Sequence, residues 1–345
     1  MKSNILIDLV NKYKNRKWNW TFISRNPNIT MEIIDKYPNK PWDWYNGVSA
    51  NENITIEFIE KYKTKDWNWT LLSKHIYVNE AIILKYLFKW DYNELSRNKH
   101  VTLDLIMTNK SLLWNRKSLM ENPNMTIEFY KTHPKMFNYI FSDHLSKNST
   151  FSLQDLEESW IKGDVYWIWE TVFRCNHNVT FDFYKQYLAG RGVSVKHLSN
   201  NPNITLDIIE DNPTLDWDWK LLSSNPNITI DFIQQNIDKF GLFDWYEISK
   251  NKGITMKDIS EYISFPWKYE GVSENPNITV QFIEEHTGLA DDKGRNYDLI
   301  SFDKLSRNNF TLFNKVKSRV LGRKKKRIQK KISKDIIWKP QEACF

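Results

Sequence analysis

Residues 51–73 carry the phrase that decides the fold, NENITIEFIEKYKTKDWNWTLLS. After its threonine, apolar residues at positions 1, 3, 4 and 7 fall on one helical face. Threonine is a good N-cap, and the acid that follows meets the positive end of the helix dipole. We therefore predict a helix of about two turns after the threonine and a second short helix at the Trp-Asn-Trp group.

The same phrase recurs along the chain. Its thirteen anchor residues are Leu6, Thr30, Thr55, Asn79, Thr102, Thr126, Ser152, Thr180, Thr205, Thr229, Thr255, Thr279 and Thr311. Intervals of 23 to 32 residues separate them, and most are 24 to 26. Such a period is typical of arrays whose units cannot stand alone. The sequence predicts an all-α fold, an α-solenoid of about thirteen short helical hairpins with a period near 25 residues, closed by a basic C-terminal helix.

This prediction divides the chain into a repeat array, residues 1–312, and a basic capping helix and tail, residues 313–345. A strand interpretation stays open, because Ile54, Ile56 and Phe58 also obey period two. The 10 glycines in 345 residues and the acid after most caps favour helices. We expect a rod or arc, which would span on the order of 110 Å if straight.

The aromatic residues recur in register at positions that an array must bury. We therefore predict that they form the core between successive hairpins, rather than a stacking surface for nucleic acid bases. The first Asn of each phrase is expected to satisfy backbone groups of its own or the adjacent unit. The structural core is predicted to include Trp18, Trp42, Trp67, Trp90, Trp217, Trp245 and Trp267.

The formal net charge of +7 belongs to the tail. Residues 315–345 hold twelve Lys or Arg and two Asp or Glu, whereas residues 1–314 sum to −3. Three interpretations of the tail stay open: a cap that keeps the array soluble, binding to RNA or DNA phosphates, and a nuclear-import or anionic-membrane signal. The candidate nucleic-acid or anion contacts are Arg323, Lys324, Lys325, Lys326, Arg327, Lys330 and Lys331.

Two interruptions of the repeat are further candidates. The 32-residue interval before Thr311 holds an inserted loop, and insertions in solenoids often lie on a contact face. Its candidate contact residues are Asp291, Asp292, Lys293 and Arg295. The second interruption, Gly190-Arg191-Gly192, is where the array is expected to bend, and it is interpreted either as an irregular linker or as a binding site.

The sequence contains no recognisable catalytic or cofactor motif. Cys175 and His177 form the only close Cys/His pair, and the second pair that a structural zinc site needs is missing. Glycine-rich phosphate loops and nucleophile elbows are also missing, so we predict no enzyme, no cofactor and no metal. With two cysteines and no secretory signal pattern, an intracellular location is expected.

The iterated Asn-Pro-Asn-Ile-Thr, followed by Glu-Phe-Ile and Trp-Asp-Trp and closing on Leu-Ser, resembles repeat proteins of mimivirus-like giant DNA viruses. The resemblance covers about residues 1–312. It implies a viral origin and a setting in the host cytoplasm or the virion, with nuclear import open because of the tail. It supplies no catalytic residue.

The function predicted from the sequence is a non-enzymatic scaffold that binds another protein through its extended helical surface. The alternative is an RNA- or DNA-binding protein that uses the basic C-terminal segment. No apolar run approaches the roughly 20 residues of a membrane-spanning helix.

Overall fold

The computed structural model describes residues 4–137, 142–290 and 296–310. These residues are mainly helical, which confirms the all-α prediction. In the described part of the chain, the only strands are β1 (Leu289–Ala290) and β2 (Asn296–Tyr297), which pair antiparallel with Leu289 opposite Tyr297. The predicted C-terminal helix falls in residues 311–345, outside the described residues.

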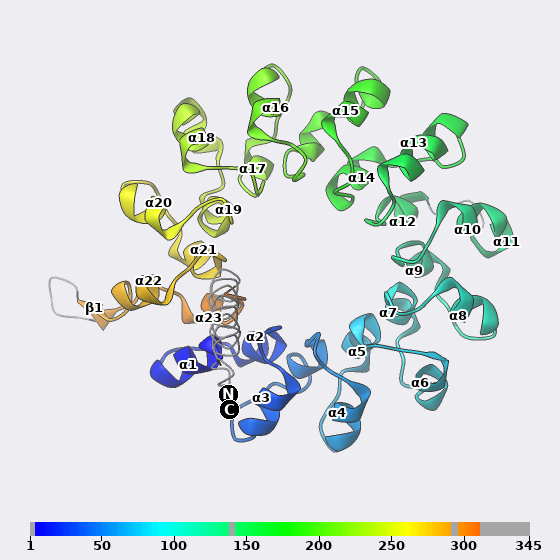
Figure 1. The fold of residues 1–345 in the computed structure, drawn as a ribbon, viewed down its shortest axis with the longest axis horizontal. Coiled ribbons are helices and arrows are strands. Elements are labelled where there is room, and N and C mark those ends of the chain that lie inside the picture. The colour runs from blue at the N-terminus through cyan, green and yellow to red at the C-terminus, as the bar shows by residue number, and fades with distance from the viewer. Residues whose placement is uncertain (1–3, 138–141, 291–295, 311–345) are drawn as a thin grey trace, which may run out of the picture.

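The helices form two concentric rows around a toroid (Figure 1). The outer row is α1 (Ile5–Lys12), α3 (Met31–Lys36), α4 (Ile56–Lys61), α6 (Glu80–Lys85), α8 (Leu103–Thr108), α10 (Ile127–Thr132) followed by α11 (Pro134–Phe137), α13 (Leu153–Lys162), α15 (Phe181–Phe183) followed by η2 (Tyr184–Leu188), α16 (Leu206–Asp211), α18 (Ile230–Gln235) followed by η4 (Ile237–Leu242), α20 (Met256–Glu261) and α22 (Val280–Glu285). The inner row is α2 (Trp20–Arg25), η1 (Val48–Ala50), α5 (Trp69–His75), α7 (Tyr92–Arg97), α9 (Arg116–Met120), α12 (Ser142–Ser146), α14 (Trp169–Cys175), η3 (Val195–Leu198), α17 (Trp219–Leu222), α19 (Trp245–Lys250), α21 (Tyr269–Glu274) and α23 (Phe302–Leu305).

Each outer helix and the inner helix that follows it are called a unit here, numbered 1 to 12 in chain order. Residues 4–310, apart from the two gaps in the description, contain twelve such units. The sequence predicts about thirteen, but the thirteenth anchor, Thr311, lies outside the described residues. We call the connections between the outer and inner helices of all units the A–B rim.

The outer helices begin where the sequence predicts, except α1, which begins at Ile5 with Asn4 as its N-cap and not after the anchor Leu6. Thr229, for example, has extended backbone and its hydroxyl accepts a hydrogen bond from the Phe232 N–H at 3.3 Å, with Asp231 in the first turn. In most units the inner helix begins at the third residue of the aromatic phrase, and the middle residue is its N-cap. In unit 9 the middle residue, Asp218, is the N-cap and accepts from the Leu221 N–H at 3.0 Å. The first aromatic residue, Trp217, stays outside the helix and donates its indole N–H to the Asn212 carbonyl at 3.0 Å.

Successive units are joined by a buried serine and a buried asparagine. The Ser24 hydroxyl of unit 1 accepts the backbone N–H of Asp43 in unit 2 at 3.0 Å. Asn51 donates its amide to the carbonyls of Ser24, Asn26 and Ile29 at 2.8, 3.2 and 2.9 Å. Buried asparagines make the same kind of bond to the preceding unit at Asn98, Asn122, Asn148, Asn176, Asn201, Asn225, Asn251, Asn275 and Asn308. The first Asn of the phrase therefore satisfies backbone groups of the adjacent unit.

Large aromatic rings fill the seams between units. Trp20 lies edge to face against Trp42, with ring centroids 5.4 Å apart and an interplanar angle of 83°. The pair of Trp245 and Trp267 repeats this geometry at 5.5 Å and 83°. Of the tryptophans named as core, Trp42, Trp67, Trp90, Trp217, Trp245 and Trp267 are buried, and Trp18 is half-buried.

The last described unit packs on the first through the same bonds. The Ser306 hydroxyl accepts the Asn19 N–H at 3.1 Å, and Asn26 donates to the carbonyls of Ser306 and Asn308 at 3.2 and 3.1 Å. Phe302 lies edge to face against Trp18, at 5.0 Å and 71°. The chain is thus a closed toroid rather than the rod or arc expected from the sequence, because the rotation between units brings unit 12 back to unit 1 (Figure 1).

Closure makes a prediction for chemical cross-linking. Lys12 is paired with Glu284 across the closing seam, as Lys61 is paired with Asp35 across an interior seam at 2.8 Å. A carbodiimide, which joins contacting amines and carboxylates, should form both amide links within one chain. Mass spectrometry that found the Lys61–Asp35 link without the Lys12–Glu284 link would contradict a closed toroid in solution.

Candidate functional site

Among the described residues, no group of three or more His, Cys, Asp or Glu side chains could hold a metal ion. Cys175 is half-buried at the end of α14, and His177 is exposed in the following turn. No helix in the described part of the chain is long and apolar enough to cross a membrane.

Charge separates the toroid into two opposed halves. Residues 1–137 contain 21 Lys or Arg and 14 Asp or Glu, a net charge of +7. Residues 138–314 contain 16 and 26, a net charge of −10. The net charge of −3 over residues 1–314 is therefore the sum of a basic first half and an acidic second half.

On the A–B rim, the basic half presents a periodic series of lysines. The amines of Lys40, Lys65 and Lys89 lie 5.9, 4.9 and 5.7 Å from the ring centroids of Trp20, Trp44 and Trp69. Each lysine thus lies over the second tryptophan of the aromatic phrase in the preceding unit. Sequence reasoning missed this series, although its spacing of 25 and 24 residues is the period of the repeat itself.

Exposed apolar side chains gather on the same rim. Five of the ten large apolar residues exposed in the described part of the chain lie on connections from an outer to an inner helix, and two more, Ile237 and Leu242, are the end residues of η4. The five are Tyr45, Phe88, Leu113, Tyr166 and Ile263. Phe88 is 98% exposed and Tyr166 81%, so neither ring contributes much to the core. Single exposed apolar residues are ordinary, but here they recur at the same place in several units.

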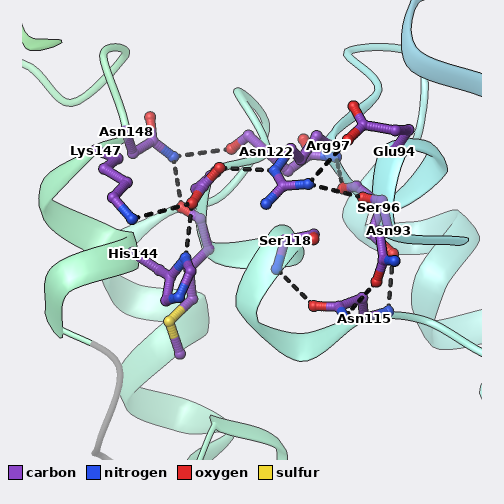
Figure 2. Close-up of polar contacts among 12 residues, drawn as sticks. Asn93, Glu94, Ser96, Arg97, Asn115, Ser118, Asn122, His144, Lys147 and Asn148 are labelled. Atoms are coloured by element: carbon purple, nitrogen blue, oxygen red, sulfur yellow. Dashed lines mark hydrogen bonds and ion pairs between the residues drawn. The ribbon is translucent and has the colours of Figure 1, made fainter. Parts of the chain in front are cut away.

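The inner row carries polar networks instead. Figure 2 shows one of them, in which side chains of α7 and α12 converge on the segment after α9. Glu121 accepts from Arg97 Nε at 2.7 Å and pairs with His144 Nδ1 at 2.7 Å. Burial alone would raise the pKa of Glu121, but Arg97 and His144 outweigh it and lower that pKa. A carboxylate held ionised by two partners ties units 4, 5 and 6 together and does not resemble a catalytic acid.

One position of the asparagine series holds a histidine. His75 occupies the place of Asn51 or Asn98, and its Nε2 lies 2.9 Å from the Ser49 carbonyl, so this nitrogen carries the proton. Its Nδ1 is buried without a hydrogen-bond partner among the described residues. Burial lowers the pKa of His75 below the ordinary 6.5, with the Ser49 bond opposing that shift.

The buried histidine makes stability depend on pH. Below pH 6.5 the unfolded chain takes up a proton at His75 that the folded chain does not accept, so stability is lost as the pH falls. His75→Asn, which restores the repeat residue, should therefore lose less unfolding free energy than the wild type between pH 7.5 and 5. Urea denaturation measures this loss, and His177→Asn at an exposed position should behave as the wild type. Equal losses for the wild type and H75N would refute the assignment.

The remaining sequence-predicted sites are placed only in part. The predicted contact loop, Asp291, Asp292, Lys293 and Arg295, and the basic run from Arg323 to Lys331 lie outside the described residues. At the predicted interruption, Gly190 and Gly192 have φ of +74° and +78°, which a glycine adopts without strain. The series of inter-unit bonds continues past them, since the Ser199 hydroxyl accepts the Asp218 N–H at 2.9 Å.

The comparisons with known proteins add no family. No protein-family model, curated protein or solved structure matches this chain.

Proposed function

We propose that this protein is a non-enzymatic scaffold, a closed α-solenoid, that binds another protein through its A–B rim. The observation that carries the proposal is the recurrence of exposed Phe88, Leu113, Tyr166 and Ile263 on this rim. Protein interfaces use apolar and aromatic anchors surrounded by polar residues, and the rim alternates such anchors with lysines. A partner with an acidic surface around apolar contacts suits the basic half.

The test compares two sets of surface substitutions in affinity capture from cells that produce the protein. Phe88→Ser/Leu113→Ser/Tyr166→Ser removes three rim anchors, and Tyr77→Ser/Leu84→Ser removes two exposed apolar side chains that lie off the rim. We expect one protein to be retained by the wild type and the off-rim variant and lost from the rim variant. Retention by the rim variant would exclude the rim as the binding surface.

Nucleic-acid binding is the second candidate, because the only dense cationic run of the sequence lies between Arg323 and Lys331. Binding through that run should weaken steeply with added salt and disappear on truncation after Asn314. Protein capture through the rim should survive the same truncation and high salt. The truncated chain therefore separates the two candidates in a single comparison.

A further inference from the structure

The A–B rim holds a cavity of about 600 Å³ between units 5 and 6. Apolar side chains from α8, the following connection and α11 form much of its wall, namely Ile106, Met107, Leu112, Trp114 and Met136. Small-molecule sites have volumes of roughly 300–1,000 Å³ and mostly apolar walls with a few polar groups. The cavity thus has the size and the lining of a ligand site.

Three cations and no acid line this cavity. Lys110, Arg116 and Lys135 are exposed, and within the described residues none of them has an acidic partner. Their uncompensated positive charge stands beside the apolar wall formed by Trp114 and Met136. A ligand that satisfies both features carries an acid group on an apolar body.

Arg116 also breaks the aromatic pattern of the seams. It is the first residue of α9, and that position is aromatic in most other inner helices: Trp20, Trp69, Tyr92, Trp169, Trp219, Trp245, Tyr269 and Phe302. Tyr92, for example, lies edge to face against Trp114 of the next unit at 6.0 Å. A guanidinium in this position can bind a planar acid group through paired hydrogen bonds and can stack on a flat ring.

The corresponding groove between units 3 and 4 lacks this combination. It measures about 590 Å³, but Glu60 and Asp66 line it together with its lysines. Glu60 is paired with Lys85, and Trp69 packs edge to face on Trp90 at 5.1 Å and 81°. In this groove the carboxylates and the aromatic ring come from the protein itself, so we do not expect it to bind an aromatic acid, and it serves as an internal control.

We propose that the cavity between units 5 and 6 binds an aromatic acid. The ring lies between Trp114 and Met136, in place of the aromatic side chain that Arg116 replaces. The acid group is bound by Arg116, with Lys110 and Lys135 beside it. This site lies on the rim proposed above for protein binding, beside Leu113, but the ligand proposal does not depend on that function.

Naphthalene-2-sulfonate is the probe, and its uncharged counterpart naphthalene-2-sulfonamide is the control ligand. Calorimetry on the full chain should show one binding site for the sulfonate and binding of the sulfonamide weaker by about tenfold or more, the contribution of a charge-assisted contact. The methyl NMR signals of Met107 and Met136 should shift on addition of the sulfonate. Absence of sulfonate binding, or unmoved Met107 and Met136 signals, would overturn the proposal.

Variants complete the test. Arg116→Ala, at an exposed position, should weaken sulfonate binding about ten- to hundredfold. Arg116→Trp, which restores the aromatic pattern, should abolish it. Lys63→Ala in the groove between units 3 and 4 should leave it unchanged. If circular dichroism shows that Arg116→Trp does not fold, the test uses Arg116→Ala and Lys110→Ala. Sulfonate binding with wild-type affinity by both of these variants would refute the site.

Discussion

Asn225→Leu should lower the free energy of unfolding by about 3–5 kcal/mol, although it keeps the volume of the side chain nearly constant. Asn225 is fully buried and donates its amide to the carbonyls of Ser199, Asn201 and Ile204 at 2.8, 3.1 and 3.1 Å. Its side-chain oxygen, Oδ1, accepts the Asn227 N–H at 2.9 Å. Leucine leaves these buried backbone groups unpaired, and each such group costs about 1–3 kcal/mol.

Urea denaturation followed by circular dichroism measures this loss. Asn227→Ala is the graded control, because Asn227 is only partly buried and makes two bonds, to the carbonyls of Pro202 and Ile204 at 2.9 Å each. Its loss should be near 1 kcal/mol. A loss below about 1 kcal/mol for N225L would show that the asparagine series does not hold the units together.

Trp217→Ala should cost about 3–5 kcal/mol, as truncations of large core residues do. Trp217 is 5% exposed, its ring lies 5.9 Å from that of Phe181, and its indole N–H bonds to the Asn212 carbonyl. Alanine removes the ring from the seam between units 8 and 9, and the neighbouring helices can only partly close the space.

Trp217→Phe separates packing from hydrogen bonding, since it keeps an aromatic ring and removes the indole N–H. Its loss, measured by the same denaturation, should be clearly smaller than that of the alanine variant. A destabilisation below about 1 kcal/mol for W217A would contradict burial of this ring in solution.

Closure of the toroid changes which surfaces can bind a partner. An open array would expose the ends of its first and last units, whereas here Asn26 and Phe302 bury those ends against each other. The inner row is committed in part to contacts such as Arg97 with Glu121. The A–B rim, with Phe88 and Lys89 exposed side by side, takes no part in these contacts, which supports the proposal that it binds the partner.

Local chemistry explains what could be predicted and what could not. The threonine caps, the buried tryptophans and the bonds of Asn51 follow from residue types and short spacings. The inner-helix N-caps were missed, although Asp218 between two tryptophans is a strong capping residue. The cavity at Arg116 could not be predicted, because it requires knowing that α9 and α11 meet across a seam.

The sequence by itself determined the helices, their order and the residues that join each unit to the next, because caps, apolar periodicity and a 25-residue repeat act over short distances along the chain. Only the tertiary structure decided that the array closes. Twelve units close into a toroid when each is rotated by about 30° relative to the one before, and a smaller rotation leaves an open arc. So small an angle depends on how side chains such as Trp20 and Trp42 interlock, and no single repeat records it.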